Sequence, residues 1–185
     1  MIDSLIVMRI IFIHGNDTLH WSYGWAPWLK KSVEELGIAS VFETFPDSII
    51  ARKKYWLRFL KQTLAAGKED ILVGHSSGAL AAMRYAEDTK IRGSILISPS
   101  YTDLGSELEK QSGYFDGPWQ WEKIKSNNSF IGLFFSDNDP YIPKEEFLHI
   151  RSRLDPDTFR FKDRGHFMDE EFSELLDYLK KKVRV

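Results

Sequence analysis

Short apolar runs rich in β-branched and aromatic residues recur along the chain and are typical of buried strands. They lie at residues 9–13, 41–45, 71–73, 94–97, 130–135 and 158–161. Because most of them are apolar throughout rather than alternating with polar residues, we expect strands whose two faces are both covered.

Segments with the helical period separate these runs. After Gly24, apolar side chains fall at positions 25, 28, 29, 33 and 36, and similar spacing occurs in 56–64, 80–86, 147–154 and 172–183. The last of these has acidic residues at 169–171 and lysines at 180–182, which suits the helix dipole at both ends. Strands that alternate with helices predict a three-layer α/β fold, with a parallel sheet of about six strands between helices.

One segment breaks the alternation. Residues 98–118 are polar and weakly periodic, and a short helix is expected at 119–126. A loop of this length in a compact domain is usually functional or disordered, and its aromatic residues favour a functional loop. We therefore expect residues 98–126 to form a small cap, in which Tyr114, Phe115 and Trp119 supply the apolar wall of a substrate pocket. In the alternative reading, Trp119 and Trp121 only seat the short helix on the sheet.

Length and composition limit the class of protein. The 185 residues suit one domain spanning 1–185, and 43% hydrophobic with 28% charged residues is ordinary globular usage. A net charge of −2 gives no basic field for a phosphate backbone, so no nucleic acid partner is expected. Without cysteine, a disulfide framework, a thiol nucleophile and a zinc–thiolate site are excluded.

The sequence matches neither the usual targeting signals nor the usual metal-binding motifs. Residues 1–13 lack a basic start and a cleavage site, so we read them as a short lead-in and a strand. No apolar run reaches 18 residues, so neither a membrane span nor a membrane partner is expected, and a cytoplasmic location is the default. Residues 137–139 resemble the start of a calcium loop, but Ile142 stands where glycine is needed. We therefore expect neither a metal nor a cofactor.

The clearest chemical signal is the run Gly74-His75-Ser76-Ser77-Gly78, which lies between a predicted strand and a predicted helix. A serine on a sharp strand-to-helix turn, flanked by glycines two residues away on each side, is the pattern of a nucleophile elbow. The glycines are needed because the turn packs too tightly for a Cβ atom. We predict Ser76 as a nucleophile.

A serine hydroxyl needs a base, and the base needs a group that orients it. In this fold the acid and then the histidine follow later strands. Of the five histidines, His166 alone lies on a loop between the last strand and the last helix, directly after Gly165. Asp139 is preferred over Asp137 as the acid because Ile142 can then anchor the loop in the core.

The negative charge that develops on a carbonyl oxygen during acyl transfer needs preorganised donors. The amide of Ser77 is predicted to be one of them. The loop after the first strand should supply the other, for which Asn16 is our choice, with Gly15 and Asp17 left open.

With these residues placed, the chain resembles the retinoblastoma-binding protein 9 family of small serine hydrolases, within the α/β-hydrolase superfamily. The resemblance covers nearly the whole length. It rests on residues 74–79, 81–87, 112–115, 118–125, 139–140 and 165–167. It implies a trimmed α/β-hydrolase sheet and the triad of Ser76, Asp139 and His166.

The sequence departs from this family in two places. The family's Leu-x-Cys-x-Glu element, used in binding retinoblastoma protein, corresponds here to residues 63–69, which contain no cysteine. Binding of that partner is therefore not supported. The loop from Gly15 to Trp21 is also less rich in glycine than the family's Gly-Asn-Gly-Gly form.

The function predicted from these features is hydrolysis of small carboxylic esters, with amino-acid esters and small amides as further substrates. Acyl transfer to an acceptor other than water would use the same triad. A non-catalytic interaction module on the same fold is the alternative from another class, and an intact triad argues against it.

Overall fold

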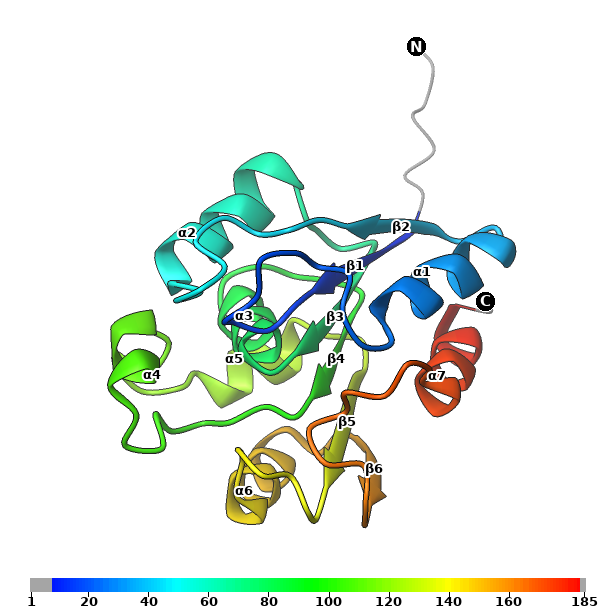
Figure 1. The fold of residues 1–185 in the computed structure, drawn as a ribbon. Coiled ribbons are helices and arrows are strands. Elements are labelled where there is room, and N and C mark those ends of the chain that lie inside the picture. The colour runs from blue at the N-terminus through cyan, green and yellow to red at the C-terminus, as the bar shows by residue number, and fades with distance from the viewer. Residues whose placement is uncertain (1–7, 184–185) are drawn as a thin grey trace.

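The computed structural model describes residues 8–183 and contains a parallel sheet in the order β2-β1-β3-β4-β5-β6 (Figure 1). The predicted lead-in at residues 1–7 lies outside the described residues. The strands are β1 (Arg9–Ile13), β2 (Ala39–Phe42), β3 (Asp70–His75), β4 (Gly93–Ile97), β5 (Ile131–Ser136) and β6 (Asp157–Phe161). The helices are α1 (Ala26–Glu35), α2 (Lys53–Arg58) with the π-helical turn Phe59–Thr63, α3 (Ser77–Ala86), α4 (Glu107–Ser112), α5 (Trp121–Ser126), α6 (Lys144–Leu154) and α7 (Ser173–Val183).

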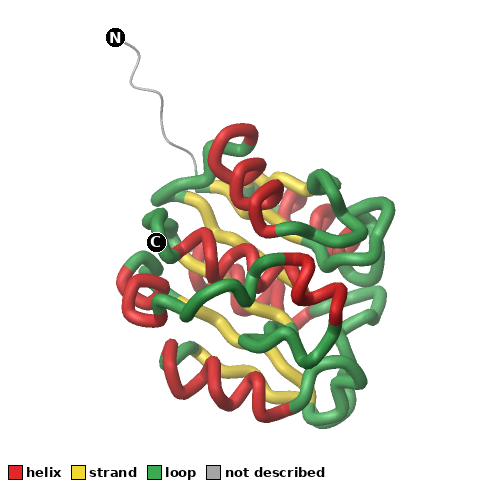
Figure 2. Tube along the Cα trace, turned by 90° about the vertical axis from the view of Figure 1, so that its left-hand side faces the viewer, coloured by secondary structure: helices red, strands yellow, loops and turns green. Residues whose placement is uncertain are grey.

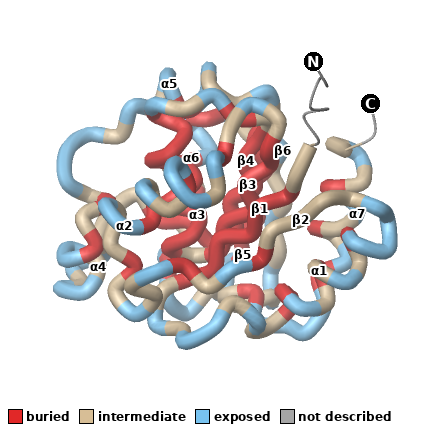
Figure 3. Tube along the Cα trace, turned by 90° about the horizontal axis from the view of Figure 1, so that it is seen from above, coloured by how far each residue is buried: buried red, intermediate tan, exposed pale blue. Residues whose placement is uncertain are grey.

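Side chains that alternate along each strand build two cores. In β1, Ile10 and Phe12 belong to the cluster that contains residues of α1 and α7. Ile11 and Ile13 belong to the other cluster, with residues of α2, α3, α5 and α6. The sheet therefore lies between two helical layers, as Figure 2 shows, and its central strands are buried on both faces (Figure 3). The predicted three-layer architecture is confirmed.

Two local predictions differ from the structure. The second strand lies at Ala39–Phe42 instead of 41–45, because Phe45 leaves the sheet and packs against Trp56, with ring centroids 5.3 Å apart. Helix α4 forms inside the segment predicted to be irregular. The Ser106 hydroxyl accepts a hydrogen bond from the amide of Glu109 at its start, and Gly113, with φ 76°, ends it.

The strand order places the functional loops. Since all six strands are parallel, their carboxyl ends lie at one edge of the sheet. The chain winds from β1 outward to β2 and then returns to place β3 on the other side of β1. A crevice forms where the winding reverses in this way, and ligands of open α/β sheets bind there. Among residues 8–183, every helix is too short or too polar to cross a bilayer.

Candidate active site

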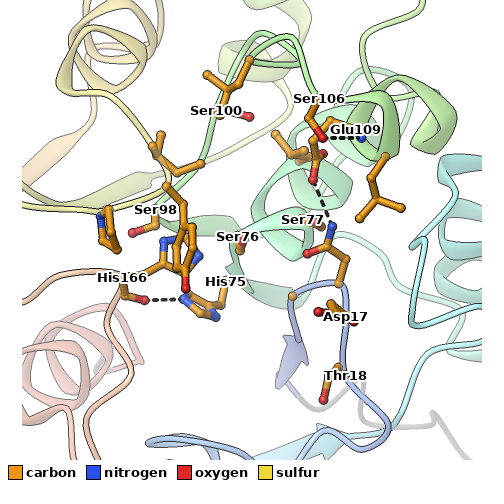
Figure 4. A pocket seen from close by; sticks show the side chains of 18 of the residues that line it. Asp17, Thr18, His75, Ser76, Ser77, Ser98, Ser100, Ser106, Glu109 and His166 are labelled. Carbon is orange, nitrogen blue, oxygen red and sulfur yellow. Dashed lines mark hydrogen bonds between the residues drawn. The ribbon is translucent and has the colours of Figure 1, made fainter.

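Ser76 sits on a strained turn between β3 and α3. Its backbone has φ 55° and ψ −120°, a conformation that costs a residue other than glycine about 1–3 kcal/mol. The turn is held because the Ser76 amide donates to the carbonyl of Ile97 at the end of β4, over 2.8 Å. The side chain lies in the lining of a cavity at the carboxyl edge of the sheet (Figure 4).

The flanking glycines are required by contact distances. A Cβ atom on Gly74 would lie 2.3 Å from the carbonyl oxygen of Gly78, and one on Gly78 would lie 2.0 Å from that of Ile13. Both contacts are with backbone, which cannot move aside as a flexible side chain can. The turn can therefore form only with glycine at both positions.

His166 and Asp139 meet across the loops that follow β6 and β5. The Nδ1 atom of His166 lies 2.9 Å and 3.1 Å from the two carboxyl oxygens of Asp139. The Asp139 carboxylate also accepts hydrogen bonds from the Ser98 hydroxyl and from the amides of Tyr141 and Ile142. Burial raises the pKa of Asp139, but these hydrogen bonds and the charge of His166 outweigh it, so the pKa falls below its usual value.

Asp137 is engaged elsewhere. Its carboxylate accepts bidentate hydrogen bonds from Arg160 on β6, at 2.9 Å to each oxygen for the closest pairs. The acid predicted to orient the histidine thus contacts His166, whereas the alternative acid is exposed and paired with an arginine.

The His166 loop is held in a sharp bend. Gly165 and Phe167, on either side of His166, both have left-handed backbone conformations, with φ 51° and 54°. The ring of Phe167 is fully buried, and the amide of Gly165 donates to the side chain of Asn138. Among residues 8–183 no hydrogen bond joins Ser76 Oγ to His166 Nε2, although both line the cavity. Such contacts are often long before substrate binds.

The loop after β1 forms the opposite side of the crevice. His14 is buried, its Nε2 atom accepts from the amide of Phe45, and its Nδ1–H donates to the carbonyl of Gly15 over 2.6 Å. Burial lowers the pKa of His14, which keeps the ring neutral. The sequence suggested only that His14 structures this loop.

The cavity encloses about 740 Å³ and is bounded by turns after β1, β3, β4 and β5, by the His166 loop and by the 98–126 segment. Apolar side chains in its wall are Leu80, Leu104, Leu108, Tyr141, Ile142 and Met168. The carboxyl and imidazole side chains that line it are those of Asp17, Glu109, His75 and His166, and within residues 8–183 neither lysine nor arginine lines it.

The structure places Tyr114, Phe115 and Trp119, the predicted pocket wall, in or against the core. None of the three lines the cavity. Tyr114 is fully buried in the core, while Phe115 and Trp119 pack against the same core cluster. Their place is taken by Leu104 and Leu108, which the pattern did not single out.

Two buried charged residues hold the 98–126 segment against the body. Arg84 on α3 donates to the carbonyls of Tyr114, Gly117 and Pro118, and its guanidinium lies 3.7 Å from the centre of the Trp119 ring. At the other end, Glu146 on α6 accepts hydrogen bonds from the backbone and hydroxyl groups of residues 101–102. Arg84 and Glu146 were missed because their contacts join residues far apart in sequence.

No group of three or more histidine, aspartate or glutamate side chains that could hold a metal ion occurs between residues 8 and 183. A strained serine, a partly buried histidine–carboxylate pair and a crevice at the reversal of the sheet form the arrangement expected of a serine hydrolase site on an α/β-hydrolase fold.

Comparison with known proteins gives the family. Residues 11–180 match the model of the family described as serine hydrolase, so this chain belongs to that family. The serine hydrolase RBBP9 of Rattus norvegicus is 44% identical over 160 residues, which cover 86% of each chain. The predicted family resemblance is confirmed.

Solved structures share the fold. The crystal structure of the ydeN gene product from B. subtilis superimposes with a TM-score of 0.86 at 23% identity, covering 95% of this chain and 98% of that one. Est1E from Butyrivibrio proteoclasticus does so with a TM-score of 0.75 at 14% identity, covering 97% and 89% of the two chains.

Proposed function

We propose that this protein hydrolyses small carboxylic esters through an acyl-enzyme on Ser76, with His166 as general base and Asp139 as the group that orients it. The observation that carries the proposal is the convergence of three strand ends. The strained Ser76 turn and His166 share one cavity wall, and Asp139 holds Nδ1 of His166, which leaves Nε2 to act on the serine. A non-catalytic module would have no use for this arrangement.

The reaction follows from these positions. His166 Nε2 takes the proton of the Ser76 hydroxyl as Oγ bonds to the ester carbon. When the tetrahedral intermediate collapses, the carbon–alkoxy bond breaks and His166 returns the proton to the leaving alcohol. Water, deprotonated by His166, then attacks the acyl-enzyme, and the acid and free Ser76 are released.

We propose the amides of Asn16 and Ser77 as the oxyanion donors. Ser77 is the first residue of α3, where amides have no partner within the helix. Of the three candidates in the first loop, the Gly15 amide donates to Tyr23 and the Asp17 amide to Ile49. Because His14 holds the Gly15 carbonyl, the Asn16 amide of the same trans peptide points the opposite way.

The charges of the cavity support a substrate class. Two carboxyl side chains, Asp17 and Glu109, line it, and none of the lysines and arginines in the described part of the chain does. An ester carrying a carboxylate or phosphate would meet like charge there, whereas a neutral or amine-bearing ester would not. We therefore infer that neutral esters and amino-acid esters are preferred.

A labelling experiment tests the nucleophile. A fluorophosphonate probe should modify Ser76, identified by peptide mass spectrometry, and Ser76→Ala should lose both labelling and ester turnover. Ser100→Ala is the matched control, since Ser100 lines the same cavity without lying on the strained turn. Labelling that persists in Ser76→Ala would refute the proposal.

The substrate class is tested with three p-nitrophenyl esters of similar size, namely those of alanine, N-acetylalanine and succinate. The succinate is esterified at one carboxyl group only, so it carries a free carboxylate. The first two should be hydrolysed with higher kcat/KM than the anionic succinate ester. A preference for succinate would contradict the inference from the cavity charges.

A further inference from the structure

A chain of three partly buried hydrogen bonds crosses the crevice and does not include the proposed triad side chains. The Gly15 amide donates to the hydroxyl of Tyr23 over 2.7 Å. That hydroxyl lies 3.0 Å from His75 Nδ1, and His75 Nε2 lies 2.8 Å from the carbonyl oxygen of His166. Figure 4 shows the contact between His75 and His166. The chain thus joins the loop after β1 to the loop after β6.

Every proton in this chain has a determined position. A carbonyl oxygen only accepts, so the hydrogen of His75 must be on Nε2, which leaves Nδ1 to accept from the Tyr23 hydroxyl. Burial, reinforced by the charge of His166, lowers the pKa of His75 to about 3, and burial raises that of Tyr23 to about 12. His75 is therefore neutral and Tyr23 protonated near neutral pH.

We propose that Tyr23 and His75 are positioning residues that hold the main chain of His166 and the amide of Gly15, the residue before Asn16, in fixed relative places. This inference rests on the proposed function, because the relative position of His166 and the Asn16 amide matters only if they act as general base and oxyanion donor. His75 lies one residue from Ser76, so the same short segment carries the nucleophile and the strut that supports its base.

The proposed function places demands on the His166 backbone that Asp139 alone does not meet. Asp139 fixes the tilt of the imidazole through Nδ1. The His75 contact instead fixes the main-chain carbonyl of the same residue, His166. A displacement of about 1 Å in such a site can cost about 100-fold in rate. The rings that face His75 are those of His166, Trp25 and Tyr23, with centroids 4.9, 5.9 and 6.0 Å away.

Tyr23→Phe tests the chain with little change in volume. It removes the acceptor of the Gly15 amide and the donor to His75 while the ring stays in place. We expect kcat for a p-nitrophenyl ester to fall about 10- to 100-fold, with KM within about threefold, because the loss affects the position of reacting groups. The rate of fluorophosphonate labelling at Ser76 should fall by a similar factor.

Tyr85→Phe is the matched control for a merely structural role. The Tyr85 hydroxyl also makes a buried hydrogen bond, to the carbonyl of Ala66 over 2.8 Å, but it does not line the cavity. Both variants should lose a similar few degrees of Tm, and only Tyr23→Phe should lose kcat. If the two variants keep equal kcat, the positioning role is overturned.

Two substitutions of His75 separate its two contacts. The amide nitrogen of Gln reaches the place of Nε2 and can donate to the His166 carbonyl, whereas the shorter Asn side chain reaches only the place of Nδ1. His75→Gln should therefore retain several-fold more kcat than His75→Asn. The double variant Tyr23→Phe/His75→Asn should be no slower than the slower single variant, since both break one chain. Additive losses would overturn the proposal.

The unmodified protein supplies a test that does not depend on how variants fold. Nitrogen-15 NMR at pH 7 should show His75 as the neutral tautomer with hydrogen on Nε2. Detection of the Nδ1–H tautomer or of a charged ring would overturn the proposed chain of hydrogen bonds. This result is distinguishable from failure of the proposed function, in which Ser76 of the unmodified protein would not react with the fluorophosphonate.

Discussion

The two sides of the cavity are built differently. On one side, Ser76 and His166 lie on loops that follow strands of the parallel sheet, and a backbone hydrogen bond to the end of β4 holds Ser76. On the other, Leu104 and Leu108 belong to the 98–126 segment, which leaves the sheet and is held by buried charged side chains. A scaffold of this kind allows the segment to change while the reacting groups stay in place. Changes on the first side should therefore alter kcat, and changes on the second should alter stability or selectivity.

The largest effect is expected from the carboxylate behind His166. Asp139→Asn should reduce kcat about 10⁴-fold, because an amide that replaces the carboxylate favours the wrong tautomer of the histidine. Asp137→Asn is the control, since this carboxylate binds Arg160 at the surface, and its kcat should change little. Steady-state kinetics on one ester would measure both. If the Asp137 variant is the slower one, the acid has been assigned to the wrong residue.

On the segment side, Arg84→Met should act on stability. Arg84 is buried with Glu87, and removing one partner of a buried ion pair costs about 3–5 kcal/mol in the free energy of unfolding. Arg92→Met, which breaks a partly exposed pair with Glu69, should cost less than about 1 kcal/mol. Denaturant unfolding measures both values. The comparison fails if Arg84→Met loses kcat for a small ester while its stability is unchanged.

Most of the candidate site could be predicted from the sequence because its signals are local. The glycines around Ser76 and the single glycine before His166 are consequences of backbone geometry within a few residues. The Tyr23–His75 and His75–His166 contacts, by contrast, span 52 and 91 positions, and no local pattern indicates them. These contacts can be predicted only once the strand order is known.

The 98–126 segment was harder to predict because aromatic content does not say which way a ring faces. Tyr114 is fully buried in the core cluster that includes residues of α3. Its main-chain carbonyl accepts a hydrogen bond from Arg84, which lies 30 positions away in the sequence. One local signal was available and was missed. Ser106 and Glu109 have the spacing of a capping box, and α4 begins between them.

Acid should destabilise the catalytic side through His75. The unfolded chain binds a proton on this histidine below a pKa of about 6.5, whereas the folded protein does so only near its pKa of about 3. Because the unfolded state binds more protons between these values, stability falls as the pH is lowered through this range, by up to about 1.4 kcal/mol per pH unit from this residue. Unfolding free energies measured from pH 6.5 to 4 should therefore fall less steeply for His75→Gln than for the unmodified protein. Parallel curves would show that His75 titrates normally in the fold.

The smallest effect is expected at the apolar wall. Leu108 is partly exposed and lines the cavity, so it can cover an acyl chain longer than acetyl. One buried methylene contributes about 0.8 kcal/mol, which corresponds to about a fourfold change in kcat/KM. Leu108→Ala should thus lower the ratio of kcat/KM for propanoate over acetate p-nitrophenyl esters about fourfold, with acetate itself nearly unchanged.

Phe115→Ala supplies the decisive contrast for this wall. Phe115 lies in the same segment and packs against the core without lining the cavity. Its truncation should lower Tm and leave the ratio of the two esters unchanged, whereas Leu108→Ala should do the opposite. A ratio that responds to Phe115 and not to Leu108 would mean that the segment repacks when substrate binds, because only a moved segment could bring the Phe115 ring to the acyl chain.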